Sequence, residues 1–171
     1  MFQLSGADRH RRSKGLVFAL CLWPILAGCQ TEFETCCVLP NKDIVLDQYG
    51  DFSVIDGTHT VFEYYHEVPD PPLVLDAGMS QRLVFQIDSN VTGFTVADAD
   101  LGPHRAMYRY SGFSPYAADH PVSSGVIAGA EVFSMKWLVD IDVVITLRAV
   151  GGGISTSTKE LHLRREFPVR P

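Results

Sequence analysis

Apolar side chains occupy every second position from Met135 to Leu147, and charged residues such as Lys136, Asp140 and Asp142 lie between them. A repeat of two residues, kept over 13 positions, cannot make one face of a helix, because helical faces repeat every 3.6 residues. The segment is therefore predicted to be a long strand with one face in a hydrophobic core. Its apolar positions are Met135, Trp137, Val139, Ile141, Val143, Ile145 and Leu147.

Other segments predict further strands around this one. Alternation of apolar and polar residues indicates strands at 83–87 and 106–110, and residues 156–167 are predicted to return as the last strand after the glycines at 151–153. Asp56-Gly57 lies between two β-rich runs and predicts a hairpin turn, because Gly accepts a positive φ. Residues 112–124 are predicted to form a long loop whose aromatic residues either pack over an end of the sandwich or are candidate binding groups.

No long helical pattern follows residue 29, so the chain is predicted to be all-β. Short strands with turn residues between them are typical of an antiparallel, immunoglobulin-like β-sandwich, and a closed barrel is the alternative. The 143 residues that follow position 28 are enough for one domain with a sizeable core.

The first 28 residues have the features of an export signal. Arg9, Arg11, Arg12 and Lys14 precede an apolar stretch at 15–28, whose 14 residues fall short of the roughly 20 that a membrane-spanning helix needs. An uncleaved anchor, or an ordinary signal followed by a chance cysteine, is the alternative. The tetrapeptide that ends this stretch is Leu26-Ala27-Gly28-Cys29.

This tetrapeptide resembles the lipobox of bacterial lipoproteins. The resemblance implies cleavage between Gly28 and Cys29, a diacylglycerol on the Cys29 thiol and an acylated new amine. The expected organisation is a signal peptide at 1–28, a lipidated tether at 29–35 and a β-sandwich domain at 36–171. Gln30, rather than Asp, resembles the family pattern for sorting to the outer membrane, facing the periplasm, in cells with two membranes.

Charge argues against nucleic acid as a partner. The chain has 14 Lys and Arg and 20 Asp and Glu. The leader contains four of the basic residues and one of the acidic ones, which leaves 10 against 19 and a formal charge of −9. Such a surface does not attract nucleic acid or anionic lipid, so the lipid anchor is expected to hold the protein to the membrane.

Two cysteines remain when Cys21 leaves with the signal and Cys29 carries lipid. Cys36 and Cys37 are adjacent, and neighbouring Cα atoms, about 3.8 Å apart, are closer than a disulfide normally requires. Two ordinary thiols are one interpretation. A redox pair or a clip for a soft metal is the other.

Motifs for catalysis are absent from the sequence: it has no Gly-x-Ser-x-Gly, no His-Glu-x-x-His and no Gly-rich phosphate loop. Asp98 with Asp100, and Asp140 with Asp142, place paired carboxylates on one face of a strand, which a carbohydrate hydrolase requires if they converge in a cleft. Solvated strand faces carry the same pattern.

Four soft or imidazole ligands define a speculative Cu(I) site. Thioethers with imidazole suit that ion, although Met also fills gaps in cores, and Met135 shares the phase of the core residues. The four residues are Met79, His104, Met107 and Met135.

A second resemblance covers residues 83–167. Val91-x-Gly93 leading to Asp100-Leu101-Gly102, followed by Met135-Lys136-Trp137-x-Val139 in a late strand, resembles the FixH/YtkA-like immunoglobulin-type domains of bacterial envelope proteins. The resemblance implies a small β-sandwich, which in that family is sometimes associated with copper or with cytochrome oxidase assembly.

These observations predict a lipid-anchored, extracytoplasmic module that binds a protein partner or assists assembly in the envelope, without catalysis and without a cofactor. A Cu(I)-binding accessory protein is the alternative function, and a small carbohydrate hydrolase is the third.

Overall fold

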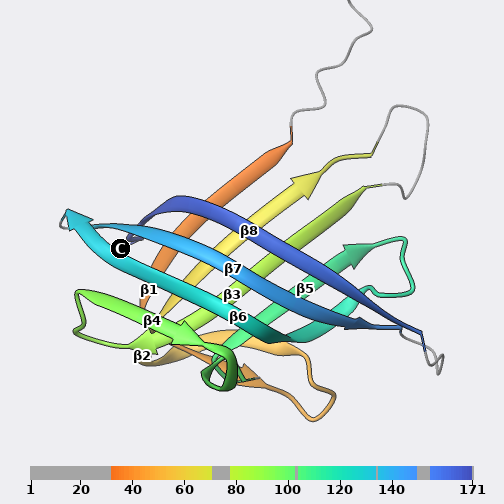
Figure 1. Ribbon diagram of the computed structural model, residues 1–171, viewed down its shortest axis with the longest axis horizontal. Coiled ribbons are helices and arrows are strands. Elements are labelled where there is room, and N and C mark those ends of the chain that lie inside the picture. Colours follow the sequence, from red (N-terminus) through yellow and green to blue (C-terminus); the bar gives the residue numbers. More distant parts are fainter. Residues whose placement is uncertain (1–31, 71–77, 103, 134, 150–154, 171) are drawn as a thin grey trace, which may run out of the picture.

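Nearly all of the described chain is β-strand. A computed structural model describes residues 32–70, 78–102, 104–133, 135–149 and 155–170, and these form eight antiparallel strands and one short 3-10 turn (Figure 1). The strands are β1 (Phe33–Leu46), β2 (Phe52–Val68), β3 (Met79–Asp88), β4 (Gly93–Ala97), β5 (Ala106–Gly112), β6 (Ala118–Phe133), β7 (Lys136–Arg148) and β8 (Thr156–Pro168), and the turn η1 spans Asp98–Asp100. The proposed leader, tether residues 29–31 and glycines 151–153 lie outside the described residues.

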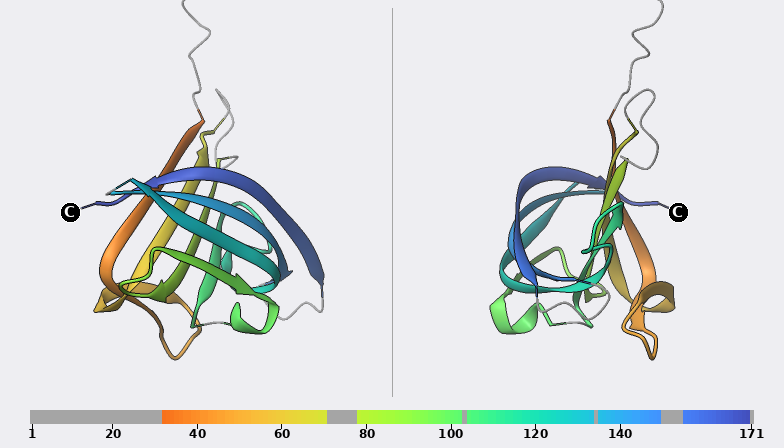
Figure 2. Two further views of the ribbon diagram at one scale, coloured as in Figure 1. Left: turned by 60° about the vertical axis from the view of Figure 1, so that its left-hand side comes forward. Right: turned by 90° about the vertical axis from the view of Figure 1, so that its right-hand side faces the viewer.

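One continuous sheet folds into two facing layers. Its strand order is β1-β2-β3-β5-β6-β7-β8. Strand β4 is not part of this order and pairs with β6. The start of β6, at 118–121, pairs with β5 in the first layer, and the rest of β6 pairs with β4 and β7 in the second. We call these layers A (β1, β2, β3, β5) and B (β4, β7, β8), with β6 joining them (Figure 2).

Gly125 lies where β6 leaves layer A. Its φ is +117°, a conformation that L side chains rarely adopt, and a Cβ here would lie 2.2 Å from the backbone oxygen of Asp142. The carboxylate of Asp98 in η1 accepts a hydrogen bond from the Gly125 N–H at 3.0 Å. The bend between the layers therefore requires glycine at this position.

The main core lies between the layers. The odd-numbered residues of β7 from 137 to 147 are all buried, as the two-residue repeat predicts. They pack against aromatic rings from both layers, and two of these rings, Phe62 and Phe85, stack at 4.8 Å. The aromatic group comprises Phe62, Phe85, Phe94, Trp137 and Phe167. The predicted all-β, antiparallel, sandwich-like fold is confirmed.

Layer A is apolar on its outer face as well. The end of β1 and the start of β2 curl over this face and cover a second cluster of buried side chains. This cluster consists of Ile44, Phe52, Val61, Val84 and Met107. A bulge permits the curl: Lys42 lies opposite both Asp56 and His59, and the preceding Asn41 has a φ of 55°.

The hairpin predicted at Asp56-Gly57 is wrong. Both residues lie inside β2, and the turn between β1 and β2 is at 47–51. The Asp43 carboxylate explains the difference, because it packs directly against Gly57 and accepts hydrogen bonds from the backbone N–H groups of Thr58 and His59. A tertiary contact therefore uses the glycine for a bulge, where local sequence favoured a turn.

Two other boundaries differ from the prediction. β7 begins at Lys136, because Met135 lies in the turn before it, with a φ of 88° and 56% exposure. The loop predicted at 112–124 is only 113–117, because β6 begins at Ala118 and already contains His120. No helix among the described residues is long and apolar enough to cross a membrane.

Candidate binding surface at the N-terminal end

Four strand ends meet at one end of layer A. The register pairs Phe33 with Glu67, Val68 with Met79, and Met79 with Gly112. The start of β1, the end of β2, the start of β3 and the end of β5 therefore lie side by side (Figure 1). Strand β1, the first strand of the described chain, begins at this end.

Exposed aromatic rings surround this end. Phe33 is 55% exposed and packs edge-on against Tyr65, with ring centroids 6.2 Å apart. Phe113, directly after β5, is 92% exposed. Tyr65 and Phe113 border an open hollow of about 510 Å³. We call Phe33, Tyr65, Phe113 and this hollow the aromatic end.

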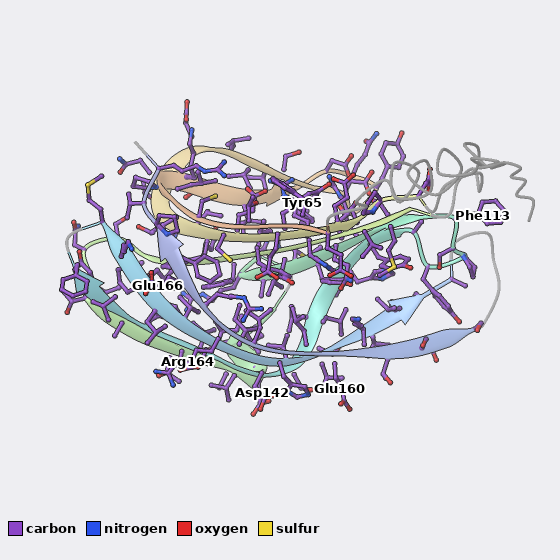
Figure 3. The ribbon with its side chains drawn as sticks, turned by 90° about the horizontal axis from the view of Figure 1, so that it is seen from above. Tyr65, Phe113, Asp142, Glu160, Arg164 and Glu166 are labelled. Carbon is purple, nitrogen blue, oxygen red and sulfur yellow. The ribbon has the colours of Figure 1, made fainter. Side chains whose placement is uncertain are left out.

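Alternation along the strands places the polar part of the hollow on the outer face of layer A. Ser80 and Ser111 are register partners there, and Glu67 pairs with Ser80. The Tyr65 hydroxyl donates a hydrogen bond of 2.7 Å to Glu67, and this bond raises the pKa of Tyr65. Figure 3 shows Tyr65 in layer A and Phe113 at the end of the molecule.

The hollow is acidic. Glu67 and Asp70 line it, no Lys or Arg is among its described lining residues, and Glu32 is exposed close to the start of β1. Carboxylates do not bind phosphate or nucleic acid, which need cationic or N–H donors. The aromatic end instead suits a partner whose surface is uncharged or amphipathic and rich in apolar groups.

The four residues of the speculative copper site lie apart. Met79 faces the interior, where its sulfur accepts a hydrogen bond from the Tyr110 hydroxyl at 3.7 Å. Met107 is buried in the cluster on the opposite face of layer A. Met135 lies in the turn between β6 and β7, and His104 is exposed between η1 and β5. The structure does not bring these side chains together.

Cys36 and Cys37 are both free, and their side chains point to opposite faces of β1. Cys36 pairs with Tyr64 toward the interior, and Cys37 pairs with Glu63 on the outer face. Burial, with the neighbouring Glu34, raises the pKa of Cys36 to about 11, and burial also raises the pKa of Cys37. The two thiols therefore form neither a bridge nor a joint metal clip, and neither is activated as a nucleophile.

The two candidate acidic pairs lie in different parts of the fold. Asp98 and Asp100 lie in η1 rather than on a strand, which corrects their predicted placement. Asp140 and Asp142 are exposed on the outer face of layer B, where Asp140 faces Arg164 at 3.4 Å and Asp142 faces His162 at 2.7 Å. Figure 3 shows Asp142, Glu160 and Arg164 pointing away from the core. Each carboxylate thus has its own cationic or imidazole neighbour on an exposed strand face.

The described histidines are dispersed. His59 contacts Asp43, His66 lies near Glu32, and His162 lies near Asp142. His120 is buried, with Nε2 placed 3.0 Å from the Tyr116 carbonyl, where it fixes the short loop before β6. Among residues with described positions, no group of three or more His, Cys, Asp or Glu is arranged to hold a metal ion.

The most buried ion pair was not predicted from sequence. The Asp119 side chain is 2% exposed and accepts hydrogen bonds from Arg109 Nε and Nη2 and from the Phe52 N–H. The Arg109 guanidinium also lies 4.4 Å from the centroid of the Phe52 ring. These contacts among Asp119, Arg109 and Phe52, which we call the latch, hold the curled start of β2 against layer A.

The fold and this surface define a class: a two-layer all-β domain with an acidic, aromatic-rimmed end where its first strand begins. Comparison of the chain with protein-family models, with curated proteins and with solved structures finds no match.

Proposed function

We propose that the protein is a lipid-anchored, extracytoplasmic β-sandwich that binds a protein partner in the cell envelope and performs no catalysis. One observation carries the proposal furthest. Strand β1 begins at Phe33, only four residues after Cys29, and it begins at the aromatic end, where Phe33 and Phe113 are exposed. A short tether of this kind suits a domain held directly against a membrane by the lipobox-like cysteine.

The chemistry of the described side chains supports a binding role. Of the carboxylates that a hydrolase could use, Asp140 faces Arg164, Asp142 faces His162 and Asp98 accepts a backbone N–H, and the described histidines lie in separate places. Nothing in the structure favours Cu(I) binding by the four residues considered for it, because they lie apart: Met79, His104, Met107 and Met135. We therefore advance neither the copper alternative nor the hydrolase.

The anchor is tested by mass spectrometry of the full-length chain expressed in a bacterium with its own leader. We expect an N-terminal peptide that starts at Cys29 and carries lipid, and a Cys29→Ser variant that carries no lipid. An intact leader with an unmodified sulfur at Cys29 contradicts the proposal.

The partner is tested by photo-crosslinking of the lipidated protein in its own envelope. A photoreactive residue replaces Tyr49, 80% exposed at the far end of β1, or Asp140 on layer B. We expect one of these positions to yield a discrete crosslink to another envelope protein that survives gentle detergent. Recovery of the chain alone from both positions contradicts the binding role.

A further inference from the structure

The proposed lipid anchor fixes which part of the fold meets the bilayer. Phe33 is four positions after Cys29, and a fully extended chain covers at most about 3.6 Å per residue, so the start of β1 lies within about 14 Å of the Cα of the lipidated cysteine. Because the ends of β2, β3 and β5 are beside the start of β1, the whole aromatic end is held near the membrane surface.

The side chains at this end suit a lipid interface. Phe113 has 92% of its surface exposed and Phe33 has 55%, which are poor positions for phenyl rings in water. Aromatic rings are favoured where apolar chains meet polar headgroups. Phe33 and Tyr65 come from β1 and β2, and Phe113 comes from the loop after β5, so three separate segments present rings at one end.

The charge of this end selects the type of lipid. Glu67 and Asp70 line the hollow, no basic side chain is among its described lining residues, and Glu32 precedes β1. Anionic headgroups would be repelled by these carboxylates, whereas zwitterionic headgroups carry an ammonium group that carboxylates can approach.

We propose that the aromatic end is a membrane-docking surface, with Phe113 and Phe33 inserted among the headgroups of the zwitterionic bilayer that holds Cys29. The proposal rests on the lipid anchor of the proposed function. It adds an orientation: layer A stands with this end on the membrane, and the turn at 47–51 points away from it (Figure 2).

Tryptophan quenching tests the orientation. The mature lipoprotein is reconstituted into phosphatidylcholine vesicles whose acyl chains carry bromine near the headgroup, which quenches nearby indoles. Trp137, buried at 6% exposure, supplies the baseline of the wild-type protein. We expect the Phe113→Trp variant to be quenched at least twofold more than the wild type.

Two matched variants control for position. Tyr49, 80% exposed, lies at the far end of β1, and Phe133, 75% exposed, ends β6 at a second apolar tip. We expect Tyr49→Trp and Phe133→Trp to add an unquenched signal. The orientation is overturned if Phe113→Trp is not quenched beyond the wild type, or if either control is quenched more strongly than Phe113→Trp.

Lipid composition gives a second readout. Replacing part of the phosphatidylcholine with phosphatidylglycerol at low salt is expected to reduce the quenching of Phe113→Trp, and added salt is expected to restore it. An increase on adding the anionic lipid would overturn the role assigned to the acidic rim.

The same samples separate the two proposals. Flotation with the vesicles and the mass of the N-terminal peptide report the anchor, whereas quenching reports the orientation. A protein that neither floats nor carries lipid refutes the proposed anchor. A lipidated protein that floats without extra quenching of Phe113→Trp refutes only the docking surface.

Discussion

Single residues in this fold owe their importance to partners that are distant in sequence. Asp119 accepts the N–H of Phe52 across 67 positions of the chain and holds the guanidinium of Arg109. In the sequence, Arg109 has the appearance of a solvent-facing strand residue, because it alternates with buried tyrosine and alanine. No local pattern identifies such a latch, since its members become neighbours only when the start of β2 curls over layer A.

Replacing Asp119 with alanine should therefore destabilise the protein. The substitution leaves the Phe52 N–H and the Arg109 guanidinium without their acceptor, and we expect a loss of about 2 kcal/mol, reduced from the full value for a buried pair because Arg109 is 35% exposed. Urea unfolding measures this loss. The control is Asp140→Ala, whose exposed partner is Arg164 and whose expected effect is below about 0.5 kcal/mol. Equal effects for both variants would contradict the latch.

Asp43 should make stability depend on pH. Hydrogen bonds from His59 and from the Thr58 N–H lower the pKa of the Asp43 carboxyl below its ordinary 3.8. A group with a lowered folded-state pKa stabilises the protein above its unfolded-state pKa and loses this contribution as the pH falls through the folded-state value. Below about pH 4, we expect the midpoint of urea unfolding to fall less steeply in Asp43→Asn than in the wild type. Parallel profiles would count against this role.

Strands could be predicted from the sequence where the burial of one strand face alone produces an alternation of apolar and polar residues. β7 has a buried residue at every second position from 137 to 147, and the sequence predicts this strand to within one residue. Prediction failed where tertiary contacts decide the backbone. Asp56-Gly57 has the local preference of a turn, but the Asp43 carboxylate converts it into a bulge. The aromatic end was only partly predictable. The loop that contains Phe113 was predicted to offer aromatic binding groups, but Phe33 and Phe113 are far apart in sequence and only the register of layer A places them at the same end.

The bend of β6 is expected to tolerate no side chain at Gly125. In Gly125→Ala, the methyl group would meet the backbone of Asp142 and Val143 at 2.2 and 2.7 Å, in a conformation with positive φ. We expect a loss of about 2–3 kcal/mol in thermal or urea unfolding. Gly102→Ala is the matched control, because nothing lies within 4 Å of its added Cβ, and its effect should stay below about 0.5 kcal/mol.

At the scale of the whole molecule, the two clusters share layer A and should unfold together. Cys36 borders the main core and Cys37 is 2% exposed on the other face, so each thiol reports one side of that layer. In the folded protein, a thiol reagent at pH 7 should label neither Cys36 nor Cys37 rapidly, because burial hinders access and raises both pKa values.

Labelling during urea unfolding tests this cooperativity. Both cysteines should become reactive in a single transition that coincides with the loss of Trp137 fluorescence. A Tyr49→Cys variant, at a site 80% exposed, should be labelled at once in the native state. If Cys37 reacts at much lower urea than Cys36, the two faces of layer A open independently, and the prediction is wrong.

The place of β1 has a mechanical consequence. Its 14 residues are hydrogen-bonded to β2 along their length, and Val38 also forms a parallel bridge with Val169 near the other end of the described chain. A pull exerted through Cys29 would act along the axis of β1. The backbone hydrogen bonds between β1 and β2 would then be loaded in shear and would share the force, whereas a pull across the strands would break them one at a time.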